Sequence, residues 1–533
     1  MSKSEITMSA GCGAESIPVP GASRAVASSA VAALHGTGSA TTRFNWLRRI
    51  CSFPAMLAAL MVGAVFLGAR GFIVDPDLWW HIKVGQNILS THSWPTTDPY
   101  SFTVAGHPWL AYEWLGEVLL GAVERFWGLQ GLEACLVVLG SAVMLALYAY
   151  TTLRTGNSKA GFAASAVLYL LAAPSFSLRP QMLGYLFLIL TLIALERFRQ
   201  GNSRALWFLP PLYLIWVNTH GSWVIGLGSI FVFWASGLKD LHLGSIEARR
   251  WSIAERIRIE SVFLLCLAVL PITPYGVRVA ASPFEYAFDL PLNVTHIQEW
   301  QPMPFSLTGG KIFLALLLGF FLLNMAVRFS CRLHELVLFV GGTVMACLHL
   351  RFLLVFVPFF APLFATTLER WIPAYDKRKD YIILNVVLMV AVFAAMVRYF
   401  PTAAEMQQSV TRQYPVRAVE YLRQHPVPGP MYNTYGYGGY LIWSSLPGHR
   451  LFIDGRADLY ERGGTFAEYL QTADLRPAAF SVLRRYGIQS CFLERGEALA
   501  TVLSASPEWQ RVYSDDLSAL FVLRKSVGIP SSN

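Results

Sequence analysis

Long apolar segments recur along the chain from about residue 53 to residue 400, and they limit the possible folds more than any other feature. Of the 533 residues, 54% are hydrophobic and only 14% are charged, whereas a soluble protein carries roughly 25% charged residues. A helix of about 20 apolar residues is long enough to cross a bilayer. The sequence therefore predicts a polytopic α-helical membrane protein.

The apolar segments predict about eleven transmembrane helices. They cover residues 53–73, 129–151, 160–173, 182–197, 205–219, 222–238, 259–275, 312–327, 334–349, 352–368 and 381–399. With a cytoplasmic N-terminus, nineteen Lys and Arg residues fall in the cytoplasmic segments and eight in the segments on the other side. Because basic residues accumulate on the cytoplasmic side, we expect the N-terminus inside and the C-terminus outside. The net charge of +9 is then an orientation signal, and no nucleic-acid partner is expected.

This topology divides the chain into three parts. Residues 1–42 are rich in Ala, Ser and Gly and lack the apolar core of a signal peptide, so they are expected to be a disordered cytoplasmic tail. Residues 43–400 form the membrane domain, with two long outer loops at 74–128 and 276–311. Residues 401–533 have the composition of a soluble domain outside the membrane.

Short β-like runs alternate with helical patterns in residues 401–533, which favours a small α/β domain. The expected strands are Tyr440–Trp443, Leu451–Ile453, Ser490–Leu493 and Leu520–Leu523, and the expected helices are Arg417–His425 and Pro477–Tyr486. The glycines of residues 436–439 and Gly455 are interpreted as turn formers.

The first outer loop begins with a cluster of polar and aromatic residues. Asp75, Asp77, Trp79, Trp80 and His81 lie within seven residues of each other, directly after the first apolar segment. Ionisable residues beside a bilayer indicate a functional site. Two neighbouring carboxylates also repel each other unless a cation or a proton lies between them. The aspartates are therefore candidate catalytic residues, or ligands of a divalent metal ion such as Mg or Mn.

Other unusual polar residues fall on the same predicted side. Arg179, His220 and Arg351 lie between pairs of spans, and Glu299 lies in the second long loop. Carboxylates can activate a hydroxyl group, while arginine and histidine can bind a phosphate. Together these residues suit a lipid-linked phosphate donor and a polar acceptor. The seven cysteines form no metal-type or disulfide pattern.

Residues 113–127 show helical amphipathicity. Acidic residues at 113, 117 and 124 share one face, opposite Leu, Val and Trp. This pattern predicts a helix lying along the membrane interface, with its acidic face toward water.

The sequence resembles the GT-C superfamily of polytopic glycosyltransferases, which use polyprenyl-phosphate sugar donors. The residues that carry this resemblance are Asp75-Pro76, Trp79-Trp80 and His81. The long loop 276–311 and a C-terminal domain on the same outer face also match that superfamily. The likeness covers about residues 50–525 and is greatest to a bacterial subgroup. That subgroup shares an Arg-Pro-Gln motif like 179–181, an Asn-x-His-Gly motif like 218–221 and a glycine-rich stretch like 438–456.

The resemblance implies transfer of a sugar from a polyprenyl-phosphate carrier to an envelope glycan, lipid or protein, at the outer face of a bacterial inner membrane. Asp75 or Asp77 would be the catalytic base. Arg351, Arg179 and His220 would offset the charge of the departing phosphate, and Trp79, Trp80, His81 and Glu299 would contact substrate. The C-terminal segment has no Trp-Trp-Asp motif, so N-glycosylation of proteins is not supported.

Two alternatives remain open at this point. The first is a lipid or polysaccharide transporter, or flippase, which is expected to have ionisable residues near the bilayer midplane and inverted repeats. In this sequence the charged residues lie at the ends of the apolar segments. A non-catalytic protein of envelope assembly is the second alternative.

Overall fold

The computed structural model describes residues 46, 48–71, 73–326, 330–446 and 448–524. The predicted tail at 1–42 lies outside the described residues. The chain divides into two units, Met1–Ile50 and Cys51–Asn533.

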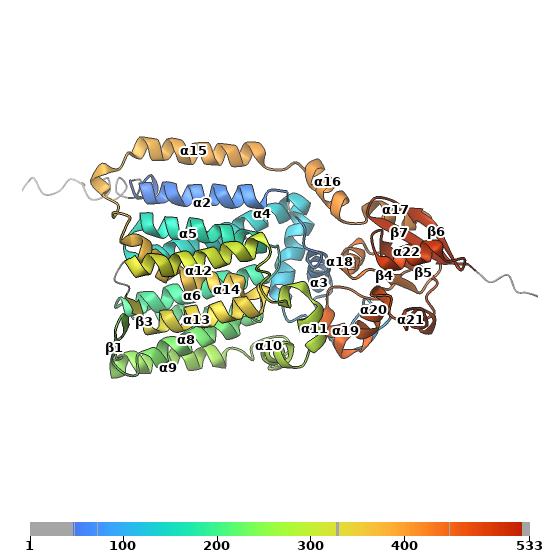
Figure 1. The fold of residues 1–533 in the computed structure, drawn as a ribbon, viewed down its shortest axis with the longest axis horizontal. Helices are drawn as coiled ribbons and strands as arrows, with labels where there is room; N and C mark the ends of the chain where they lie inside the picture. Colours follow the sequence, from blue (N-terminus) through green and yellow to red (C-terminus); the bar gives the residue numbers. More distant parts are fainter. Residues whose placement is uncertain (1–45, 47, 72, 327–329, 447, 525–533) are drawn as a thin grey trace, which may run out of the picture. The chain divides into compact units, whose positions relative to one another are not determined.

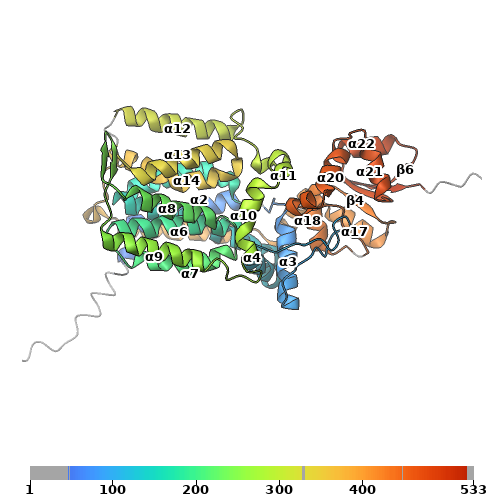
Figure 2. The same ribbon diagram turned by 90° about the horizontal axis from the view of Figure 1, so that it is seen from below.

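Residues 53–399 contain a bundle of helices that run side by side in both views (Figures 1 and 2). α4 packs against α2, α5 and α6, and α14 packs against α5 and α13. The bundle helices are α2 (Phe53–Ala69), α4 (Trp114–Thr155), α5 (Ser158–Ala172), α6 (Gln181–Arg199), α7 (Leu209–Val217), α8 (Trp223–Ser236), α9 (Ile253–Ala268), α12 (Thr308–Ala326), α13 (Leu333–Leu348), α14 (Leu353–Glu369) and α15 (Ile382–Tyr399).

Every predicted span overlaps one of these helices, which confirms the helical positions. Five helices in the described residues are long and apolar enough to cross a membrane, namely 114–155, 181–199, 308–326, 350–369 and 382–399. The helices 53–69, 205–217, 223–236 and 333–348 are apolar but shorter. The chain is thus a mostly helical protein with several candidate spans, while the count of eleven stays a prediction.

α4 contains the predicted boundary between the first loop and the second span. Gly128 has φ 59° and ψ −153°, a backbone conformation that residues other than glycine rarely adopt. The helical segment before it is the predicted amphipathic helix, and its packing differs from the prediction. Its acidic face packs against α3 (Leu78–Thr91), and Glu117 is 1% exposed. The expectation of an acidic face toward water is therefore wrong for Glu117.

Buried charges at the other end of the bundle pair with each other. Arg154 at the end of α4 donates to Glu335 at the start of α13, and Arg332 contacts Glu196 at the end of α6 at 2.5 Å. A three-stranded sheet lies at this end, with β1 (Leu241–Leu243) antiparallel to β2 (Ile246–Ala248) and β2 parallel to β3 (Cys331–Arg332). Pairing offsets the cost of burying these charges.

The loop 276–311 is largely helical. It contains α10 (Arg278–Phe288), α11 (Pro291–His296) and the 3₁₀ turn η3 (Gln298–Trp300). Glu461 of the C-terminal segment accepts hydrogen bonds from the backbone N–H groups of Leu292 and Asn293, at 2.7 and 2.8 Å. Arg462 donates to Glu285 at 2.7 Å. The loop is therefore tied to the C-terminal segment.

The C-terminal segment has a four-stranded sheet in the order β4-β5-β7-β6, in which only β4 and β5 are parallel. The strands are β4 (Met431–Asn433), β5 (Ser490–Glu494), β6 (Trp509–Ser514) and β7 (Ser518–Leu523). The helices are α16 (Ala403–Gln413), α17 (Val416–Gln424), α18 (Tyr435–Ser444), α19 (Ala457–Arg462), α20 (Thr465–Ala473), α21 (Ala479–Arg485) and α22 (Ala498–Ala505).

Two of the four predicted strands are confirmed, at β5 and β7, and both predicted helices are present as α17 and α21. The other two predicted strands are wrong. Residues 440–443 lie inside α18, and 451–453 form no strand beyond a bridge at Leu451. Short apolar runs have no periodicity that separates a strand from a buried helix.

The first loop and the C-terminal segment share one hydrophobic core. Trp79 of α3 is fully buried and lies 5.1 Å from the ring of Tyr414 and 5.3 Å from that of Tyr440. α3 also packs against α18. The residues just before α3 are therefore held from two sides, by the bundle and by the C-terminal segment.

Candidate functional site

Asp75 and Asp77 lie at the start of α3, where the backbone makes a tight turn. The backbone N–H of Asp77 donates to Asp75 Oδ1 at 3.0 Å, a local bond that aspartate favours in turns. Asp77 is the N-cap residue of α3, where a negative charge is stabilised by the helix dipole. The indole N–H of Trp80 donates to Asp77 Oδ1 at 3.2 Å.

Arg179 lies between both aspartates and Glu299. Its Nε donates to Asp75 Oδ2, its Nη2 lies 2.9 Å from Asp77 Oδ2, and its Nη1 lies 3.7 Å from Glu299 Oε2. Burial lowers the pKa of its guanidinium, but the carboxylates together outweigh this effect and raise the pKa well above the ordinary value. Arg179 precedes α6, so three separate segments meet at one guanidinium.

Arg351 is the second arginine of the cluster. Its Nη1 lies 3.5 Å from Glu299 Oε1, and its guanidinium lies 4.2 Å from the centre of the Trp300 ring. It belongs to the 3₁₀ turn η4 (Leu350–Phe352) between α13 and α14. Glu299 therefore bridges two arginines. We call Asp75, Asp77, Arg179, Glu299 and Arg351 the ion network.

Burial controls the charge of Asp77. Its removal from water raises the pKa of its carboxyl group to about 7, with Arg179 opposing this rise and Asp75 and Glu299 adding to it. The carboxyl group can therefore gain or lose a proton near neutral pH.

The two histidines lie beside the ion network and contact a shared carboxylate. His81 Nε2 is 3.8 Å from Glu113 Oε2, and His220 Nε2 is 3.4 Å from Glu113 Oε1. His81 Nδ1 also faces Glu117 Oε1 at 3.2 Å. Burial lowers the pKa of His220 to about 3 and that of His81 well below its ordinary value.

The C-terminal segment forms one wall of the site at Asp77. A Cβ atom added at Gly455 would overlap Asp77 Oδ1, and one added at Gly439 would overlap the carbonyl oxygen of Pro76. Gly455 also accepts a hydrogen bond from the hydroxyl of Tyr435 at 3.2 Å. Both glycines permit close approach of two segments. Gly439 lies within α18, so its interpretation as a turn former is wrong, whereas Gly455 lies at a bend.

A buried ion triad holds this wall. Arg456 donates to Asp454 Oδ2 at 2.7 Å and lies 2.7 Å from Asp98 Oδ1 of the first loop. Its guanidinium stacks over the rings of Tyr100 and Trp109, at 5.0 and 4.6 Å. A buried arginine with two carboxylates and two aromatic faces fixes the loop against the C-terminal segment.

No protein-family model matches the sequence, and no curated protein matches it. Among solved structures, an oligosaccharyltransferase from Archaeoglobus fulgidus, crystallised with a tethered acceptor peptide, has a TM-score of 0.50 at 11% identity, over 84% of this chain and 70% of that chain. This chain therefore shares its fold with that oligosaccharyltransferase. At this level of identity the similarity concerns the fold alone.

Two further solved structures have lower TM-scores. ArnT from Cupriavidus metallidurans, bound to undecaprenyl phosphate, gives 0.47 at 15% identity, over 92% of this chain and 99% of that chain. The mycobacterial arabinofuranosyltransferase AftD gives 0.48 at 13% identity, over 89% of this chain and 40% of that chain.

The predicted site residues differ in what they contact. Asp75, Asp77, Arg179, Glu299 and Arg351 form the ion network, and His81 and His220 lie beside it through Glu113. Trp80 orients Asp77. Trp79 is enclosed by Tyr414, Tyr440 and Trp443, so its ring packs in the core.

Sequence reasoning missed Glu113, Glu117 and Gly455 as residues of the site. The two glutamates are spaced one helical turn apart, but a single sequence does not show that α3 covers that face. Gly455 has no side chain, so the sequence carries no signal for its close approach to Asp77.

The donor arrangement does not fit a metal ion at Asp75 and Asp77. Oxygen atoms of both carboxylates contact the Arg179 guanidinium. In the described part of the chain, no group of three or more His, Cys, Asp or Glu side chains converges as metal ligands would.

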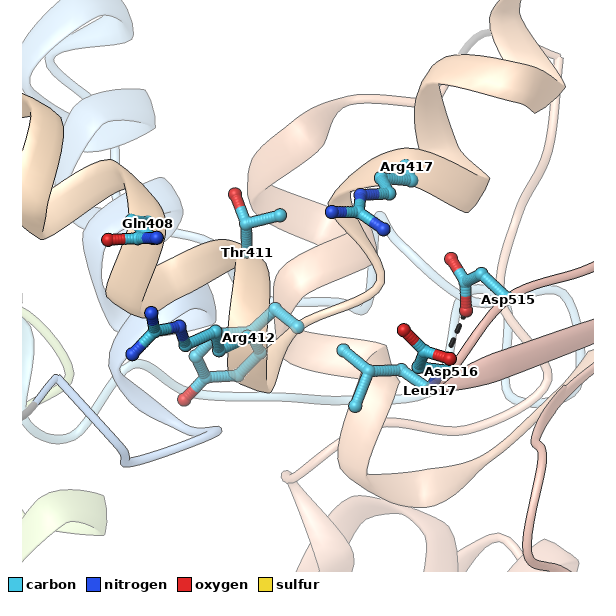
Figure 3. Close-up of a pocket in the computed structure, with 8 residues that line it drawn as sticks. Gln408, Thr411, Arg412, Arg417, Asp515, Asp516 and Leu517 are labelled. Carbon is cyan, nitrogen blue, oxygen red and sulfur yellow. Dashed lines mark hydrogen bonds between the residues drawn. The ribbon is translucent and has the colours of Figure 1, made fainter.

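A separate pocket of about 220 Å³ lies in the C-terminal segment (Figure 3). Side chains of α16, α17 and the turn between β6 and β7 surround it, and none of the predicted site residues does. Its lining residues are Gln408, Thr411, Arg412, Tyr414, Arg417, Asp515, Asp516 and Leu517.

Proposed function

We propose that this protein is a membrane glycosyltransferase that moves a sugar from a polyprenyl-phosphate carrier to a polar acceptor on the extracytoplasmic face. One observation supports this most: aspartates and arginines distant in sequence form one ion network at one end of an apolar bundle. The acceptor class is an envelope glycan, lipid or protein, and the compartment is the bacterial inner membrane with a cytoplasmic N-terminus.

The acidic side of the network supplies the base. Asp77 or Asp75 accepts the proton of the acceptor hydroxyl while the acceptor oxygen attacks the anomeric carbon and the bond to the phosphate oxygen breaks. A carboxyl group with a pKa near 7, as at Asp77, is well matched to proton transfer at neutral pH. Attack opposite the leaving phosphate inverts the anomeric carbon.

The basic side binds the phosphate. Arg179 and Arg351 are both in contact with Glu299, whose side chain is 33% exposed. A phosphate that replaces this carboxylate would contact two guanidinium groups, which match phosphate geometry and offset its growing negative charge. Trp300 fixes the plane of Arg351.

The distribution of charge disfavours transport as the main function. In the described residues of the bundle, the main ionic clusters lie at the ends of helices, as the pairs of Arg154 with Glu335 and Arg332 with Glu196 illustrate. A transporter site is expected near the middle of the spans.

Substitution of the aspartates tests the proposal. Asp75→Asn and Asp77→Asn are compared with the wild type for sugar transfer from a panel of undecaprenyl-phosphate monosaccharides in proteoliposomes. We expect at least one variant to lose about 100-fold or more in kcat, since general base catalysis contributes at least this factor. Asp289→Asn, at an exposed position after α10, is the matched control. Full activity of both variants would exclude the carboxylate mechanism.

A further inference from the structure

Four titratable side chains make a continuous series beside the ion network. Glu117, His81, Glu113 and His220 contact one another in this order, at 3.2, 3.8 and 3.4 Å. They come from α3, from the start of α4 and from the turn between α7 and α8. We call them the Glu–His chain. The proposed transfer reaction leaves Glu113 and Glu117 without a role.

Hydrogen bonds determine which nitrogen of His220 carries the proton. The backbone N–H of Ser222 donates to His220 Nδ1 at 3.1 Å. The Ser222 hydroxyl accepts from the indole N–H of Trp216 at 3.0 Å and lies 2.8 Å from the same Nδ1. Nδ1 is therefore an acceptor, and a neutral ring carries its hydrogen on Nε2, which faces Glu113.

The position of His81 between two glutamates requires a proton on one of their carboxyl groups. Its two nitrogens face two different carboxyl groups, those of Glu117 and Glu113. Because burial lowers the pKa of His81, its ring is neutral and has one N–H. The other nitrogen faces a carboxylate unfavourably unless that carboxyl group is protonated. At least one of the two glutamates must therefore hold a proton.

Burial favours a proton on Glu113, and it also favours one on Glu117, whose pKa it raises well above the ordinary value with Glu113 adding to the rise. The two arginines of the ion network face its three carboxylates, so the network already has a net negative charge. Burial raises the pKa of Glu113 to about 8, with Arg351 and Arg179 opposing the rise and Asp77 and Glu299 adding to it. Tyr112, the preceding residue, is partly buried, and desolvation raises the pKa of its hydroxyl further above the ordinary value, so it carries no charge at neutral pH.

We propose that Glu113 is a second acid–base residue of this site, which holds a proton beside His81 and His220 and delivers it to the phosphate oxygen released from the sugar. This inference rests on the proposed function. The Glu113 O–H bond breaks as the new phosphate O–H bond forms, so polyprenyl phosphate leaves with one negative charge fewer. Glu113 then regains the proton that the aspartate took from the acceptor hydroxyl. The balance needs no other reactant.

The pH dependence of Glu113→Gln tests the role of Glu113. The wild type needs the base deprotonated and Glu113 protonated, so kcat rises as pH increases through about 7 and falls as it increases through about 8. We expect Glu113→Gln to lower kcat about 100-fold, to leave the KM for the donor within about threefold and to abolish the alkaline decline. Glu124→Gln, on the same helix but beside Gln86, should keep the wild-type profile.

A wild-type profile in Glu113→Gln overturns the role of Glu113 and leaves the proposed function intact. A wild type that transfers no sugar contradicts the proposed function and the proton delivery with it.

Infrared spectroscopy of the protein without donor gives a second readout that activity does not affect. At pH 7 we expect a protonated carboxylic acid band that loses intensity in Glu113→Gln. A band unchanged by the substitution overturns the proposal, even if the variant is inactive.

Discussion

Asp77 is the residue whose surroundings the fold controls most closely. Trp80 donates to one carboxylate oxygen, Arg179 contacts the other, and Gly455 covers the first from the C-terminal segment. The sequence alone leaves open which of Asp75 and Asp77 is the base. The structure gives Asp77 a pKa near neutrality and a complete set of orienting neighbours, which favours it in our proposal.

At the residue scale, Gly455→Ala should impair catalysis through Asp77. Since the new methyl group would overlap Asp77 Oδ1, the carboxylate must move, and a displacement of about 1 Å in a reacting group costs about 100-fold in rate. We expect such a loss in kcat with smaller change in the KM for the donor.

Gly436→Ala is the matched control, because nothing lies within 4 Å of an added Cβ there. Wild-type kcat in Gly455→Ala would show that this wall does not position the base.

At the element scale, the loop with α10, α11 and η3 brings Glu299 to both arginines. The backbone N–H of Leu350 donates to the carbonyl of Gln301 at 2.9 Å, and His349 Nδ1 lies 2.6 Å from the carbonyl of Trp300. These bonds join the end of the loop to the turn that carries Arg351. The loop therefore places a carboxylate where the proposed phosphate would bind.

Removal of the negative charge of Glu299 should strengthen phosphate binding. In Glu299→Gln the two arginines lose a competing partner, whose partly exposed ion pairs are worth about 1 kcal/mol. We expect the Kd for undecaprenyl phosphate, measured by native mass spectrometry or microscale thermophoresis, to fall about fivefold. Weaker binding by the variant would place the phosphate elsewhere.

The sequence predicted elements well where periodicity and length carry the signal. The apolar segments coincide with helices, and α17, α21, β5 and β7 are also found. It failed where tertiary contacts decide the outcome. The sequence predicts that Glu117 faces water, because α3, which covers it, is distant in sequence. Residues 440–443 are predicted as a strand because four apolar residues are too few to show the hydrophobic period of a helix or of a strand.

At the scale of the whole molecule, two hydrophobic cores meet at the site. One lies in the bundle, and the other joins the first loop to the C-terminal segment. The ion network lies where these two parts meet, with Arg179 and Arg351 on turns of the bundle and Asp75 and Asp77 before α3. The predicted residues of the site could be collected on one side from the sequence, but their pairing depends on this junction.

The central claim is that the protein cleaves the bond between a sugar and a polyprenyl phosphate. The most direct measurement uses proteoliposomes with an undecaprenyl-phosphate monosaccharide labelled in the sugar, and follows both free undecaprenyl phosphate and the side of the bilayer on which the label lies. We predict release of undecaprenyl phosphate in equal amount to transferred sugar, abolished in Asp77→Asn. Movement of the intact labelled lipid across the bilayer without cleavage would contradict the account and favour a transporter.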